Sequence, residues 1–145
     1  MLKKYTPPYI TILFIVSFIN IISSTYFVSF LVAGVVFKIF SLSLDKKYNY
    51  LLSLCILTFL IIENTQGLRL FSLTLISLFV YYLIIPLIKN LFFSDRIVSF
   101  IFIACFYFLL YFLVHNVVSS DTNIFMPLLI NFIIDILIVG LLLWD

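Results

Sequence analysis

The sequence predicts an all-α membrane protein, a polytopic bundle of about six transmembrane helices that forms one integral membrane domain over residues 1–145. Two observations predict this class. Hydrophobic residues make up 66% of the chain and charged residues only 10%, whereas soluble domains carry about 25% charged residues. Long uncharged stretches follow one another, and helices are expected there because backbone groups that face lipid must be hydrogen-bonded within their own segment. This composition excludes a soluble enzyme, a nucleic-acid binder and a disordered tail.

The first uncharged stretch, residues 5–37, is too long for a single crossing. Its 33 residues would form a helix of about 50 Å, compared with a hydrocarbon core of about 30 Å. The polar cluster Asn20–Thr25 offers the only place for a turn within it. We therefore expect a first helix over about 9–22, short enough to be tilted, kinked or only partly spanning, and a second over about 26–44.

Polar breaks divide the rest of the chain in the same way. They fall at residues 63–67, 89–96 and 119–123. Pro86 lies near the end of the segment before the second of these breaks, where a missing backbone N–H costs least. The remaining helices are therefore expected over about residues 48–62, 68–88, 97–118 and 124–144.

Positive charge sets the expected orientation. With six crossings both termini lie on one side, and seven of the eight basic residues fall on or near that side. Cytoplasmic loops carry an excess of lysine and arginine, so both termini are predicted to be cytoplasmic. One long span over residues 5–37 would instead give five helices and a less favourable charge split of five to three. The seven residues are Lys3, Lys4, Lys38, Lys46, Lys47, Lys89 and Arg96, and Arg69 falls on the opposite side.

The two lysines near the N-terminus also resemble the start of a signal peptide. The apolar stretch that follows them is longer than the hydrophobic region of such peptides and has no A-x-A cleavage site. We therefore expect an uncleaved first helix.

Residue types needed for catalysis or metal binding are scarce in this sequence. His115 is the one histidine, which excludes HExxH and three-histidine sites. The three glycines are far apart and form no phosphate-binding loop, and there is no GxSxG sequence. Cys55 and Cys105 lie in different apolar runs without CxxC spacing, which favours ordinary packing. We expect no enzyme activity, no cofactor and no metal site.

Asp135 is the most informative residue because it lies about midway along the last expected helix. A carboxylate at that depth costs roughly 2.5–3.5 kcal/mol on insertion scales. Asn131 lies one turn earlier on the same face, so this face is predicted to point into the bundle or toward a partner helix. Lys38 is the expected counter-charge, in an ion pair or a hydrogen-bond clamp. The alternatives are a neutral Asp135 that only packs, and a transport or proton site.

The polar turn between the third and fourth expected helices is the second candidate site. It contains Glu63, Asn64 and Gly67, and Arg69 follows. Gly67 can adopt a positive φ and let two helices approach closely. Glu63 and Arg69 could pair across the turn, although a solvated pair contributes only about 0–1 kcal/mol. The alternative is an ordinary solvated turn on the outer face.

The region from residue 48 to residue 90 resembles the rod-shape-determining protein MreD family. The similarity lies in an apolar helix that ends in an acidic residue, ILTFLIIE at 56–63, and in a short polar turn with a Gly-Leu pair, NTQGLRLF at 64–71. The helix that follows closes with a basic residue, KNLF at 89–92. Ser53 and Thr65 stand in regions where the family usually has glycines.

This resemblance implies a non-catalytic scaffold or assembly subunit of the bacterial cell-elongation machinery, which couples cell shape to peptidoglycan synthesis. It implies a multi-pass protein of the bacterial inner membrane. The expected partners are other membrane proteins, namely an MreC-like protein and the peptidoglycan synthase complex, with the MreB filament contacted indirectly.

A solute-binding membrane subunit of an energy-coupling-factor type transporter is the alternative, because such subunits have a similar segment layout. They generally carry alanine-rich contacts in the first helix, and residues 9–22 contain no alanine. They also need several convergent polar groups for a ligand, which are scarce here. A small anchor or assembly factor of an unrelated complex is a third possibility.

Overall fold

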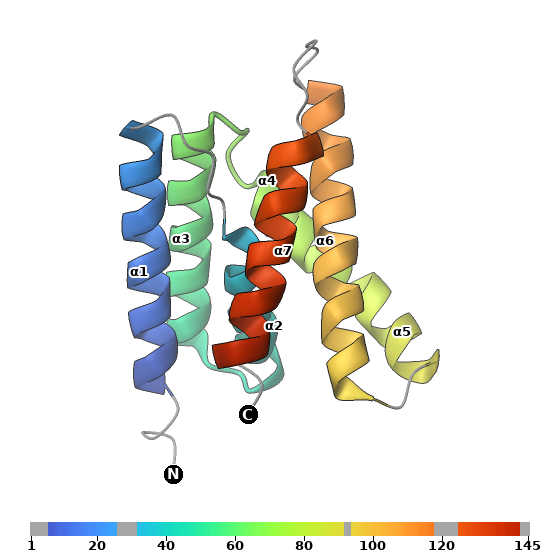
Figure 1. Cartoon of the computed structure of the whole chain (residues 1–145). Helices are drawn as coiled ribbons and strands as arrows, with labels where there is room; N and C mark the ends of the chain where they lie inside the picture. The colour runs from blue at the N-terminus through green and yellow to red at the C-terminus, as the bar shows by residue number, and fades with distance from the viewer. Residues whose placement is uncertain (1–5, 26–31, 92–93, 118–124, 143–145) are drawn as a thin grey trace.

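The computed structural model describes residues 6–25, 32–91, 94–117 and 125–142, and these residues form helices joined by short turns, with no strand among them (Figure 1). The predicted all-α class is therefore confirmed. The elements are α1 (Thr6–Thr25), α2 (Ala33–Asp45), α3 (Asn49–Gln66), α4 (Ser72–Phe79), a π-helical segment η1 (Val80–Ile84), α5 (Ile85–Leu91), α6 (Asp95–Val117) and α7 (Phe125–Leu142).

The helices alternate in direction and pack around the short helix α2. α1 packs along α3, while α2 contacts α3, α6 and α7. Figure 1 shows that α2 begins partway along α3 and ends near the end of the bundle where both chain termini lie. A segment from the first third of the sequence thus lies at the centre of the fold.

Two helices in the described part of the chain are long and apolar enough to cross a membrane. They cover Ser72–Leu91 and Arg96–Asn116. Two shorter apolar helical segments cover Pro8–Ser23 and Phe125–Leu141. On length and composition alone, these two long helices therefore support membrane association.

Two polar clusters that were predicted to end helices lie inside them instead. α1 continues through the cluster at 20–25, because Asn20 donates to the Val16 carbonyl at 3.0 Å and Ser23 donates to the Asn20 carbonyl at 3.1 Å. α3 likewise continues to Gln66, four residues beyond the predicted end. Short polar side chains can hydrogen-bond to carbonyls of the preceding turn, so their presence does not require a break.

The other boundaries agree more closely, with two exceptions. The second helix begins at Ala33 and not near residue 26, and residues 26–31 lie outside the described part of the chain. The fourth predicted helix becomes α4, η1 and α5 in continuous sequence, and the N–H of Ile85 bonds to the Val80 carbonyl five residues earlier. This wider turn directly precedes Pro86, whose ring would otherwise crowd the preceding turn and whose nitrogen has no hydrogen to donate.

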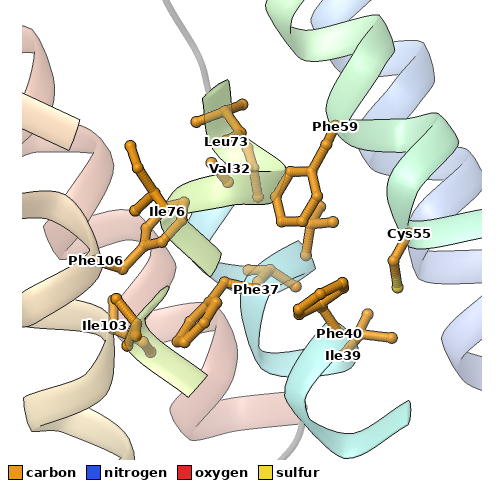
Figure 2. Packing of buried hydrophobic residues seen from close by; sticks show 14 of the residues in the cluster. Val32, Phe37, Ile39, Phe40, Cys55, Phe59, Leu73, Ile76, Ile103 and Phe106 are labelled. Carbon is orange, nitrogen blue, oxygen red and sulfur yellow. The ribbon is translucent and has the colours of Figure 1, made fainter. Parts of the chain in front are cut away.

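An aromatic cluster joins α2 to its neighbours at the centre of the core (Figure 2). Phe37 stacks on Phe106 of α6, with ring centroids 5.0 Å apart, and Phe40 meets Phe59 of α3 edge to face at 5.9 Å. All four side chains are fully buried. Such pairs add about 0.5–1.5 kcal/mol beyond the burial of their area, so they hold α2 firmly between α3 and α6.

Candidate functional site

The Asp135 carboxylate is fully buried and binds the start of α2. Its Oδ2 atom accepts a hydrogen bond from the Gly34 N–H at 2.8 Å and another from the Tyr107 hydroxyl of α6. The first N–H groups of a helix have no partner within the helix, and negative charge is favourable there. Val32 at the N-cap of α2 provides no side-chain hydrogen bond. Asp135, from a helix 101 residues along the chain, supplies the missing acceptor.

The close approach of α7 to α2 requires the absence of a side chain at Gly34. A Cβ atom built at this residue would lie 2.7 Å from Asp135 Oδ2, 3.1 Å from a Tyr107 ring carbon and 3.2 Å from Asp135 Cβ. The first of these distances is too short for any real contact. Gly34 is therefore the residue that lets the carboxylate reach the α2 backbone.

The expected ion pair between Asp135 and Lys38 is not what the structure shows. Both hydrogen bonds of Asp135 use Oδ2, and its Oδ1 atom has no hydrogen-bond partner among the described residues. Lys38 donates to Ser99 Oγ of α6 at 2.7 Å. The reason is that α2 begins at Ala33, so Asp135 meets its first turn, while Lys38 lies one turn further along and reaches a different helix.

Asn131 lies on the same buried face of α7 as Asp135. Its side chain is 1% exposed and donates to the Pro127 carbonyl, one turn earlier, at 2.9 Å. The two polar residues thus face the interior of the bundle. The sequence indicated close helix packing near Gly34 and a polar partner for the Tyr107 hydroxyl, but it did not predict that both residues bind Asp135.

Glu63 binds the start of α4 in the same manner. The side chain is 0% exposed. Its Oε2 accepts from the Phe71 N–H at 2.6 Å, and its Oε1 accepts from the Leu73 N–H at 2.6 Å and from Ser72 Oγ at 3.4 Å. α4, like α2, has no side-chain hydrogen bond from its own N-cap residue, which adopts a left-handed conformation. A second buried carboxylate therefore caps a second short helix from outside.

The predicted pairing of Glu63 with Arg69 is wrong in this structure. Arg69 and Asn64 are exposed, whereas Glu63 is buried because α3 continues past it. Gly67 ends α3 with φ +68°, and its N–H and that of Leu68 both donate to the Glu63 carbonyl. Glu63 therefore has two roles in this turn. Its backbone carbonyl accepts hydrogen bonds at the end of α3, and its carboxylate accepts hydrogen bonds at the start of α4.

Replacing Gly67 by alanine should lower the free energy of unfolding by about 1–2 kcal/mol, because a left-handed backbone is unfavourable for residues with a Cβ atom. Nothing lies within 4 Å of an added Cβ, so the cost is conformational and not steric. Asparagine tolerates this conformation better, and Gly67→Asn should lose less. Thermal unfolding of the purified variants measures both, and equal stability of wild type and Gly67→Ala would contradict this account.

A cavity of about 510 Å³ lies apart from both carboxylates. Its lining includes Lys38, Lys46, Lys89 and Arg96 but neither Asp135 nor Glu63. The described residues include no group of three or more potential metal ligands. His115 is exposed and stacks on Tyr111, and Cys55 is buried in the core.

No protein-family model, curated protein or solved structure matches this chain.

Proposed function

We propose that this chain is a multi-pass protein of the bacterial inner membrane, with six crossings and both termini in the cytoplasm. Support comes from the alternating helix directions and from the shared end at which both termini lie (Figure 1). Large apolar side chains such as Phe14, Phe108 and Leu141 are more than 60% exposed. Extensive apolar exposure of this kind is unfavourable in water, and lipid or partner helices would cover it.

Within this membrane placement, we propose a non-catalytic scaffold role in the cell-elongation machinery, similar to that of MreD. The observation that carries the proposal is the use of both buried carboxylates as helix caps. A carboxylate that carries protons or binds solute would line a cavity, whereas Asp135 and Glu63 are engaged by backbone N–H groups. The MreD-like stretch, residues 56–71, is where Glu63 and Gly67 connect α3 to α4. Its residues therefore fix helix geometry.

The proposed partners are an MreC-like protein and the peptidoglycan synthase complex, with an indirect link to MreB. A helix bundle with apolar outer faces and short connections can bind a partner protein mainly through contacts between membrane helices. The exposed phenylalanines of α1 and α6 provide such surfaces. Aromatic side chains are frequent anchors of protein interfaces, so these faces suit a subunit that holds neighbouring membrane helices.

Depletion of the chain from the bacterium that carries it tests this proposal. We expect rod-shaped cells to widen and round up within a few generations, and a tagged copy to recover an MreC-like protein from detergent-solubilised membranes. A tagged, unrelated multi-pass protein at equal abundance is the control. Unchanged cell width together with no recovery of wall-synthesis proteins would overturn the proposal. Copurification of a water-soluble small molecule would instead favour the energy-coupling-factor type transporter subunit.

A further inference from the structure

We propose that the 510 Å³ cavity binds an anionic phospholipid, with the lipid phosphate held by basic side chains and an acyl chain along its apolar wall. This inference rests on the proposed membrane placement and is independent of the proposed partners. The cavity lies where residues of α1, α2, α5, α6 and α7 converge. Its size is within the range of small-molecule sites, about 300–1,000 Å³.

The charge of the cavity is strongly one-sided. Among the residues that the structure describes, four basic ones line it, Lys38, Lys46, Lys89 and Arg96, against one acidic residue, Asp45. The chain has eight lysines and arginines in total, so half of its basic residues line this cavity. Asp45 already accepts a hydrogen bond from the Tyr81 hydroxyl at 2.7 Å. The cavity therefore favours an anion.

Lys38 distinguishes this cavity from a row of lysines in exposed loops. It lies within α2, is only partly exposed, and donates to Ser99 Oγ of α6 at 2.7 Å. Ser99 lines the same cavity. A hydroxyl and an ammonium group from two helices are thus already held together on its wall. Phosphate oxygens accept hydrogen bonds from such donors.

Much of the remaining wall is apolar, although Tyr9 and Ser41 also line it, and this apolar part favours a lipid over a free anion. Ile85, Val98, Phe102, Ile103 and Val139 all line the cavity. Inorganic phosphate would gain nothing from these side chains, whereas a hydrocarbon chain gains roughly 0.8 kcal/mol for each buried CH₂ group. Basic pockets between transmembrane helices on the cytoplasmic side are known to suit anionic lipid headgroups. The end of the bundle concerned is the one proposed to face the cytoplasm.

The test is a titration of the full-length protein, purified in a neutral detergent, with phosphatidylglycerol. Native mass spectrometry counts bound lipid for the wild type and for Lys46→Gln, Lys89→Gln and Arg96→Gln, all of which change exposed side chains. Each lost charge should weaken binding about fivefold. Lys47→Gln is the matched control, because Lys47 is adjacent to Lys46 and exposed but does not line the cavity, and it should bind like the wild type.

Two further titrations separate the possible sources of the phosphate group. Phosphatidylcholine has the same chains but no net negative charge, and inorganic phosphate has the charge but no chain, so both should bind at least tenfold more weakly than phosphatidylglycerol. Equal weakening by Lys47→Gln and the cavity variants would overturn the proposal, as would inorganic phosphate that competes at the same concentration. Melting temperatures without lipid check that each variant is folded.

Failure of the lipid site is distinguishable from failure of the proposed function. Extraction of cell membranes with alkaline carbonate tests the placement, since an integral protein stays in the pellet. A chain that stays in the pellet and recovers its partners but binds no phosphatidylglycerol would overturn the lipid site alone.

Discussion

Replacing Gly34 by alanine is expected to lower the free energy of unfolding by about 3 kcal/mol. The new Cβ atom would lie 2.7 Å from Asp135 Oδ2, so α7 must move away from α2. That movement lengthens the hydrogen bond from the Gly34 N–H and disturbs the contact with Tyr107. Overpacking costs typically about 1–3 kcal/mol, and a buried charge-assisted hydrogen bond contributes about 1.5–3 kcal/mol.

A double-mutant cycle shows whether the clash is with the Asp135 side chain. Asp135→Ala alone should also destabilise the protein, because the first turn of α2 loses its acceptor. The combination of Gly34→Ala with Asp135→Ala should cost clearly less than the two single changes added together, since the obstructing oxygen is gone. Chemical or thermal unfolding of the four proteins in one detergent measures the cycle. Strict additivity would contradict the described contact.

Replacing Glu63 by alanine is expected to have a comparable effect of about 3 kcal/mol, centred on the start of α4. The change removes the acceptor of two backbone N–H groups, those of Phe71 and Leu73. Each buried donor left unsatisfied costs about 1–3 kcal/mol. Glu63→Gln retains one acceptor oxygen and should lie between alanine and the wild type.

Asn64→Ala is the matched control for this prediction, because Asn64 is the neighbouring polar residue and is exposed. Its effect should stay within about 0.5 kcal/mol. Hydrogen exchange gives a local measurement, since amide protection at Phe71 and Leu73 should fall in Glu63→Ala while protection within α6 changes little. Equal stability of Glu63→Ala and Asn64→Ala would show that the carboxylate does not cap α4.

Hydropathy alone was sufficient to predict the helical class and the approximate positions of α6 and α7. It could not place the start of α2 or the end of α3. The protein core and the lipid are both apolar, so a membrane helix can be hydrophobic on all sides. Hydropathy then gives no sign of where one helix ends and the next begins. Polar residues are then the visible sign of a break, yet Asn20 and Ser23 donate hydrogen bonds to carbonyls of their own helix.

The partners of the two carboxylates were harder still to predict. Charge pairing suggested Lys38 for Asp135 and Arg69 for Glu63, but both carboxylates bind backbone N–H groups. The N-cap residues directly before α2 and α4 are Val32 and Phe71, which have φ values of +46° and +65° and give these N–H groups no side-chain acceptor. Bulky residues rarely adopt such a conformation, and no local sequence signal indicates it.

The two caps differ in how soon they can form during synthesis. Glu63 precedes Phe71 by only eight residues, so α4 can receive its acceptor as soon as that hairpin leaves the ribosome. α2 has to wait for Asp135, which is translated 101 residues after Gly34. Until then the Gly34 N–H lacks the acceptor that it has in the folded protein. The cap of α2 thus depends on a helix that is made much later than α2 itself, whereas the cap of α4 depends only on the helix directly before it.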